Sequence, residues 1–198
     1  LITGIGQGYI QSTPLQLCMM TAQIANGGYA IKPKIIVDSN PISYEDAKQS
    51  MESGLLFDSN SDSLLDKKLF KNKKNIKIVQ EAMFASTNER FGTSYKSRID
   101  DPKYQFAGKT GTAQVKKISK RERELDLELE QIPYKDRDHA LYVAYGPYIN
   151  PRYALSIIIE HGGSGSKAAA PIAKKLFKLI IDRHELRNKQ SNFERITI

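Results

Sequence analysis

The stretch Phe106-Ala107-Gly108-Lys109-Thr110-Gly111-Thr112-Ala113-Gln114 carries the most information about the fold of this 198-residue chain. Its pattern predicts a strand over residues 104–114. Gly111 has no Cβ, so the backbone of a bound peptide could lie against the edge of this strand as an added strand. Beside it stand the cation Lys109 and the hydroxyl groups of Thr110 and Thr112, which together suit a carboxylate ligand. The threonines could also be ordinary strand formers without a role in binding.

Lys109-Thr110-Gly111-Thr112 resembles the Lys-Thr-Gly motif of serine acyltransferases that act on penicillins and on D-Ala-D-Ala peptides. Further segments typical of the same family stand in the expected order: Gly4-Ile5-Gly6-Gln7-Gly8-Tyr9, Thr13-Pro14-Leu15-Gln16, Ala144-Tyr145-Gly146-Pro147-Tyr148, Asn150-Pro151-Arg152-Tyr153 and Ile159-Glu160-His161-Gly162-Gly163. The chain is therefore identified as a member of the class B penicillin-binding proteins, most similar to the transpeptidases of cell elongation. The resemblance covers residues 1–37 and 76–182.

The resemblance implies a role for each residue of the motif. Lys109 would be the catalytic residue that this chain carries, with its charge beside the substrate carboxylate and the proton-shuttling groups. Thr110, Gly111 and Thr112 would bind the substrate, and the backbone N–H of Thr112 would donate into the oxyanion hole. The implied fold is the α/β transpeptidase fold shared with β-lactamases, an antiparallel sheet sandwiched by helices. Residues 1–198 would form its C-terminal portion only, with the last three strands and the C-terminal helix.

The implied reaction is that of a peptidoglycan DD-transpeptidase, which cross-links stem peptides through a serine acyl-enzyme. In the family, the Ser-x-x-Lys nucleophile motif and a Ser-x-Asn motif precede the Gly-Gln-Gly segment, so we expect both upstream of Leu1. Ser164-Gly165-Ser166-Lys167 and Ser86-Thr87-Asn88 match these patterns formally, but such short motifs recur by chance. We therefore expect the isolated chain to be inactive.

The resemblance also implies partners and a location. The partners would be peptidoglycan stem peptides, β-lactam antibiotics, and the membrane glycosyltransferase with other proteins of the elongation complex. The location would be the periplasmic face of the bacterial inner membrane, with the anchor outside this chain. No cofactor is expected, and the three histidines lack the spacing of a metal site. Cys18 is the single cysteine, which excludes an internal disulfide.

The net charge of +8 is concentrated at the end of the chain, where residues 167–198 hold eight Lys or Arg against three Asp or Glu. This pattern is typical of a solvated helix face with a basic tail. No nucleic-acid partner is expected, because no known binding module accompanies the charge. Two alternatives stay open: a non-catalytic basic module that binds an anionic polymer or lipid, or a carboxypeptidase, β-lactamase or antibiotic sensor of the same fold.

Capping residues and apolar periodicity predict the remaining elements. Three helices are expected: from the capping box at Thr13 to Asn26-Gly27, over 76–87 after Asn75, and over 167–182. Strands are expected near 30–37 and, as a hairpin, over 139–148 and 153–161. Residues 38–75 and 116–138 would be insertions or loops, with a helix favoured from Ser119, and 183–198 a tail. The inward face of the last helix would comprise Ile172, Leu176, Leu179 and Ile180.

Overall fold

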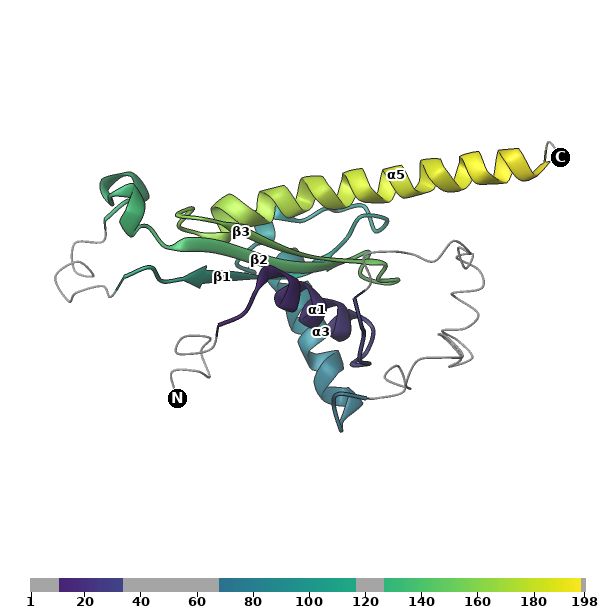
Figure 1. The fold of residues 1–198 in the computed structure, drawn as a ribbon, viewed down its shortest axis with the longest axis horizontal. Coiled ribbons are helices and arrows are strands. Elements are labelled where there is room, and N and C mark those ends of the chain that lie inside the picture. Colours follow the sequence, from purple (N-terminus) through teal and green to yellow (C-terminus); the bar gives the residue numbers. More distant parts are fainter. Residues whose placement is uncertain (1–10, 34–67, 117–126, 197–198) are drawn as a thin grey trace.

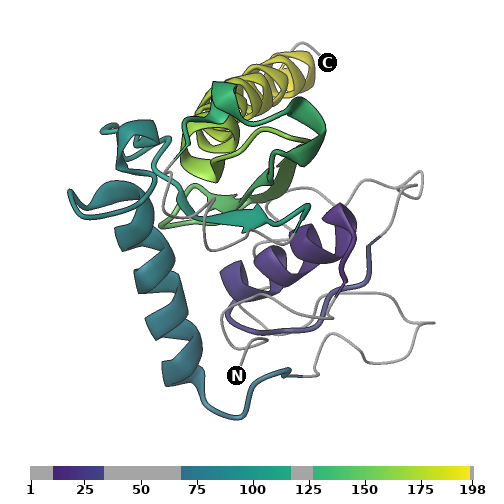
Figure 2. The ribbon, with the colours of Figure 1, turned by 90° about the vertical axis from the view of Figure 1, so that its left-hand side faces the viewer.

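Residues 11–33, 68–116 and 127–196 are described by the computed structural model, with side chains up to Arg187. Its main elements are the helices α1 (Pro14–Ala25), α3 (Lys73–Asn88) and α5 (Ala170–Ile196) and the strands β1 (Ala107–Ala113), β2 (His139–Gly146) and β3 (Tyr153–Ile159). The strands form an antiparallel sheet in the order β1-β2-β3. Helix α5 covers one face of the sheet, and α1 and α3 lie on the other (Figure 1, Figure 2). The predicted α/β sandwich is confirmed.

Helix α1 forms as its capping residues predict. The Thr13 hydroxyl accepts a hydrogen bond from the Gln16 N–H at 3.2 Å, and the Gln16 side chain accepts one from the Thr13 N–H at 2.8 Å. These two bonds satisfy backbone donors that a helix start leaves free. Asn26 ends the helix, and Gly27 and Gly28 follow with φ values of 85° and 93°, a conformation that glycine adopts without strain.

Helix α3 begins three residues earlier than the sequence predicts. Asn72, and not Asn75, accepts the capping hydrogen bond, from the Lys74 N–H at 2.9 Å. Both asparagines could cap, and the lysines between them favour an added turn. Residues 73–75 therefore belong to a helix and not to an insertion.

Two further predictions are wrong in the described residues. Residues 31–33 form no strand, and only Tyr29 makes an isolated bridge, with Lys68. Residues 127–138 hold two short 3-10 helices, Leu129–Gln131 and Tyr134–Asp136, where an α-helix was favoured. Pro133 lies between them and has no N–H to continue a helix. The Gly4–Tyr9 segment, residues 34–67 and the helix start at Ser119 lie outside the described residues.

The predicted hairpin is confirmed, with Val143 of β2 opposite Ser156 of β3. Two clusters of buried side chains hold the layers together. Toward α5 the cluster includes Phe106, Tyr142, Ala144, Ala170, Ala173, Phe177 and Ile181, and toward α1 and α3 it includes Met83, Ala107 and Tyr145. Burial of each large apolar side chain contributes about 1.5–3 kcal/mol to folding.

Helix α5 turns a different face to the sheet from the one predicted. Phe177 and Ile181 are fully buried, whereas Leu179 is 61% exposed and Ile172 and Leu176 are also exposed. The helix packs close to the sheet, so that beside Phe177 only small side chains such as Ala170 and Ala173 fit between the two. The larger side chains on the other face therefore remain exposed. The sequence predicted that this helix ends at residue 182 and that a tail follows. In the structure, residues 183–196 continue the helix. In the described part of the chain, no helix is long and apolar enough to cross a membrane.

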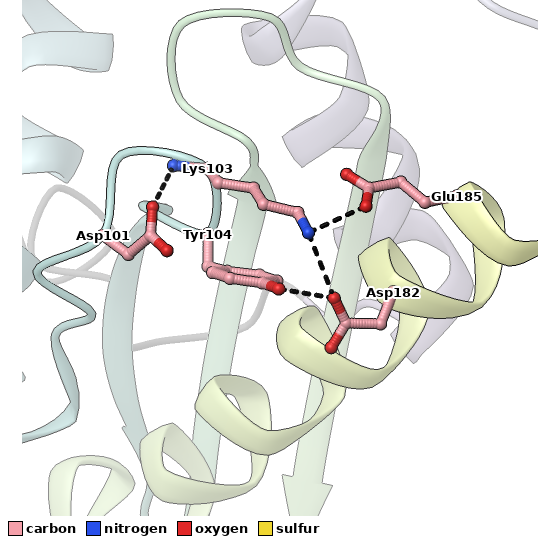
Figure 3. Close-up of polar contacts among 5 residues, drawn as sticks. All are labelled: Asp101, Lys103, Tyr104, Asp182 and Glu185. Carbon is pink, nitrogen blue, oxygen red and sulfur yellow. Dashed lines mark hydrogen bonds and ion pairs between the residues drawn. The ribbon is translucent and has the colours of Figure 1, made fainter.

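A polar cluster fastens α5 to the loop before β1 (Figure 3). The Lys103 ammonium lies 3.3 Å from Asp182 and 2.8 Å from Glu185, and the Tyr104 hydroxyl donates to Asp182. That hydrogen bond, followed by the Lys103 charge, holds the pKa of Asp182 below its ordinary value. The pKa of Lys103 is raised, chiefly by Glu185. The carboxylate of Asp182 is therefore favoured in the folded state.

The variant Asp182→Asn is expected to melt at a slightly lower temperature than the wild type at neutral pH, because these surface contacts are screened by solvent. A carboxyl group whose pKa falls on folding stabilises the protein above its unfolded pKa, about 4. The difference should therefore disappear as the pH falls through the folded pKa of Asp182. Melting curves between neutral and acidic pH test this, with Glu130→Gln as an exposed control. A difference that persists in acid would contradict the role of the carboxylate.

Candidate active site

The Lys-Thr-Gly motif lies in β1, at the edge of the described sheet. Lys109 pairs with Val143 and Gly111 with Leu141 across the strands. Since side chains alternate along a strand, Lys109 lies on the face of α1 and α3, and Thr110 and Thr112 lie on the face of α5. Lys109 and Thr112 are exposed. The motif is thus an accessible edge strand, as predicted.

A chain of hydroxyl groups continues from the motif toward the end of α3. The Lys109 ammonium donates to the carbonyl oxygen of Thr110 at 2.8 Å. The Thr110 hydroxyl lies 3.2 Å from that of Thr93, which in turn lies 3.3 Å from the hydroxyl of Ser86. Sequence reasoning missed Thr93, because its contact with Thr110 joins residues 17 apart that meet only through packing of α3 beside β1.

Tyr142 supports β1 from beneath. Its ring passes so close to Gly108 that a Cβ there would lie 2.4 Å from the tyrosine oxygen. That oxygen hydrogen-bonds with Thr87 at 2.9 Å and with Ser94 at 3.1 Å, and burial raises the pKa of Tyr142. Thr87 is completely buried in the last turn of α3. The segment Ser86-Thr87-Asn88 is therefore accounted for as a structural helix end.

The turn before α5 lies directly on the motif. Residues Gly165–Ala169 form a π-helical turn that continues into α5. A Cβ at Gly165 would lie 2.3 Å from the carbonyl oxygen of Leu141 and 2.8 Å from that of Gly111. The hydroxyl of Ser164 is 2.9 Å from that of Ser166. Ser164-Gly165-Ser166-Lys167 is therefore accounted for as a helix start.

Two of the three histidines meet at the end of the sheet where β2 begins and β3 ends, next to the end of the motif strand. The rings of His139 and His161 have centroids 4.8 Å apart. His139 Nδ1 accepts from the His161 backbone N–H at 2.9 Å, and His161 Nδ1 lies 3.0 Å from the carbonyl oxygen of Arg137, which can only accept. These bonds give the pair a structural role. The described residues contain no group of three side chains able to hold a metal ion.

A pocket of about 590 Å³ adjoins the motif. It lies where β1 ends, β2 begins and β3 ends, and Thr112 forms part of its wall. The two 3-10 helices, Leu129–Gln131 and Tyr134–Asp136, contribute Leu129 and Asp136 to its lining. An accessible strand edge that bears a cation, hydroxyl groups and a glycine, with a pocket at its end, can hold an extended peptide with a carboxylate.

Residues 1–178 match the penicillin binding protein transpeptidase domain family. The chain belongs to this family. Peptidoglycan D,D-transpeptidase MrdA of Salmonella typhimurium is 31% identical to this transpeptidase domain over 183 residues, which are 90% of the chain and 26% of that relative. The chain thus spans about a quarter of the length of the curated relatives it matches.

Solved structures of penicillin-binding protein 2 share the fold of this chain. The Helicobacter pylori protein, in complex with MreC, is 30% identical with a TM-score of 0.62, over 92% of this chain and 27% of that one. The Pseudomonas aeruginosa protein, in complex with WCK 5153, is 32% identical with a TM-score of 0.63, over 90% of this chain and 32% of that one. The family predicted from the motifs is confirmed, and the similarity to penicillin-binding protein 2 agrees with the branch that the motifs indicated.

Proposed function

We propose that this chain is the C-terminal part of a peptidoglycan DD-transpeptidase that works through a serine acyl-enzyme. The observation that carries the proposal is the Lys-Thr-Gly motif on an accessible edge strand, in a chain of the transpeptidase family. The serine nucleophile and its general base would lie in a part of the protein that this chain does not include. Ser164 is no substitute, because it belongs to the helix start before α5.

The residues of the motif would act on the substrate in order along β1. Lys109 and the hydroxyl groups of Thr110 and Thr112 would hold the terminal carboxylate of the stem peptide. The serine oxygen would attack the carbonyl carbon of the penultimate D-Ala and lose its proton to the base. The N–H of Thr112 would stabilise the resulting oxyanion, and Gly111 would let the peptide approach the strand.

Collapse of this tetrahedral oxyanion intermediate would break the peptide bond between the two D-Ala residues. The terminal D-Ala would leave as an amine, which takes up the proton that the base had accepted from the serine. An amine of a neighbouring strand would then attack the acyl-enzyme, forming the cross-link and releasing the serine. A carboxypeptidase of the same fold would differ in this second step, where water replaces the amine. A β-lactamase would also use water there, and its first step would open a β-lactam ring without release of D-Ala. The fold alone does not separate these activities.

The proposed partners are peptidoglycan stem peptides, β-lactam antibiotics, and the membrane glycosyltransferase with other elongation proteins, at the periplasmic face of the inner membrane. Support comes from the Helicobacter pylori relative, which was solved in complex with MreC. The alternative of a purely basic binding module has no such support.

A fluorescent penicillin tests the proposal. The longer protein is expected to become covalently labelled and to keep the label on a denaturing gel, whereas the isolated 198-residue chain should remain unlabelled. Prior incubation with unlabelled penicillin is the control. A labelled Ser164 would overturn the assignment, as would a longer protein that never labels. Release of the acyl group to an added amine in preference to water would identify a transpeptidase.

A further inference from the structure

A second pocket, of about 210 Å³, lies between α1 and the start of α3, the two helices on the face of the sheet opposite α5 (Figure 2). Its apolar lining comprises Met20 and Ile24 of α1, Ile76 and Val79 of α3, and Phe70 just before α3. Met20, Phe70 and Val79 are 43%, 45% and 41% exposed. The volume lies below the about 300 Å³ of common small-molecule sites, and it suits one large side chain of another protein.

The floor of this groove is held in place by contacts between the two helices. Ile76 is buried. The side-chain amide of Gln80 donates to the carbonyl oxygen of Ile24 at 2.7 Å and to that of Ala25 at 3.3 Å. These carbonyl groups lie at the end of α1, where a helix leaves its last acceptors without internal partners. The groove therefore belongs to the folded protein and needs no rearrangement to accept a partner.

Lysines gather at this end of α3. Between the lining residues Phe70 and Asn75 the chain carries Lys71, Lys73 and Lys74, and all three are exposed. None of these lysines forms an ion pair with the residues that the structure describes. The lining itself contains no charged residue, so the surroundings of the groove carry a net positive charge.

The acid nearest along α3 does not neutralise this charge. Glu81 lies 3.8 Å from Lys77, and both are exposed. Each residue turns an α-helix by about 100°, so Glu81 points about 200° away from Val79, which lines the groove. The lysines at the helix start also lie where the helix dipole is positive, and no acidic residue occupies the first turn. Cations are disfavoured there, so an anionic partner would relieve their repulsion.

We propose that this groove docks a segment of a partner protein that inserts one large apolar side chain and carries acidic residues on either side of it. The apolar side chain would pack among Met20, Phe70 and Val79. The carboxylates would pair with Lys71 and Lys73, whose charges complement them. A concave apolar site rimmed by charges favours a protruding side chain over the flat surface of a membrane.

The groove and the motif lie at opposite ends of α3. Asn75 lines the groove, and Ser86 belongs to the hydroxyl chain that reaches Thr110. A rise of about 1.5 Å per residue separates Asn75 from Ser86 by about 16 Å. A partner bound in the groove would therefore leave the motif strand open to its substrate. The proposal does not depend on the acyl-transfer reaction.

Three short fluorescent peptides of equal length test the proposal by fluorescence anisotropy with the full-length protein. The first has a central Phe flanked by Glu residues, the second has Ala in place of Phe, and the third has Lys in place of Glu. The first is expected to bind, and its affinity should fall as the salt concentration rises. The second should bind about tenfold more weakly, because it buries no large apolar side chain. The third should not bind.

Two variants assign the binding to this groove. Lys71→Glu combined with Lys73→Glu should weaken binding of the first peptide about fivefold or more. The melting temperature of this variant should not fall, because acids are favoured at a helix start. Met20→Gln should also weaken binding, by loss of apolar contact. The matched control is Lys175→Glu combined with Lys178→Glu, which makes the same change of charge on exposed positions of α5 and should bind like the wild type.

Equal affinity for all three peptides, no binding of the first peptide, or wild-type affinity in the Lys71 and Lys73 variant would overturn the proposal. Vesicles of phosphatidylglycerol and of phosphatidylcholine distinguish a membrane surface from a protein partner. If the first peptide does not bind, but the wild type prefers the anionic vesicles and the Lys71 and Lys73 variant does not, then the surface recognises a membrane and the proposed partner is wrong.

Discussion

Lys109→Ala in the full-length enzyme is expected to slow acylation by β-lactams about ten- to a few-hundred-fold. A charge-assisted hydrogen bond contributes about 1.5–3 kcal/mol, and the loss of that much transition-state stabilisation lowers the rate by this factor. The melting temperature should hardly change, because Lys109 is exposed on an edge strand and makes its only described contacts with Thr110. Stopped-flow acylation and melting curves measure both quantities.

Lys109→Arg should also be impaired, since a planar guanidinium does not replace a compact ammonium at a fitted position. Lys175→Ala, which removes an exposed lysine of α5, is the control for a general loss of positive charge. Equal acylation rates in the wild type and Lys109→Ala would remove the catalytic role. A large fall in melting temperature would make the residue structural.

Gly165→Ala should damage both stability and acylation. Its Cβ would lie 2.3 Å from the carbonyl oxygen of Leu141 and 2.8 Å from that of Gly111, and neither backbone atom can rotate away. Overpacking of this kind costs about 1–3 kcal/mol, which corresponds to a fall of roughly 2–10 °C in melting temperature for a domain of this size. Relief of the clash moves Gly111, so acylation should slow by about tenfold or more.

Ser166→Ala is the matched control, because it alters the neighbouring position of the same turn and removes only the contact with the Ser164 hydroxyl. It should change the melting temperature little. If Gly165→Ala melts and acylates like the wild type, then the close contact between α5 and the motif strand does not exist in solution.

Local patterns were sufficient for several elements. The capping box at Thr13 places the start of α1, and the alternation over 139–161 places the hairpin. These predictions succeed because the interactions that decide them join residues a few positions apart. Before α3, both Asn72 and Asn75 could cap the helix, and the start predicted from Asn75 lies about one turn too late.

The inward face of α5 shows why hydropathy alone was insufficient. Leucines and isoleucines predicted one face, yet the buried face is built from Ala170, Ala173, Phe177 and Ile181. The packing of helix against sheet decides which side chains fit, and in the turn before α5 Gly165 lies directly against the carbonyl oxygens of Leu141 and Gly111. The periodicity of apolar residues does not predict how closely a helix packs against a sheet.

The sequence by itself determined the family, the strand that carries Lys109 to Thr112 and the hairpin behind it, because short motifs and alternation record local chemistry. Only the tertiary structure decided what surrounds that strand: Thr93 beside Thr110, Tyr142 beneath Gly108, and a pocket that Lys167 reaches from the start of α5. These neighbours come from distant segments of the chain. Their meeting depends on how the layers pack, which no local pattern specifies.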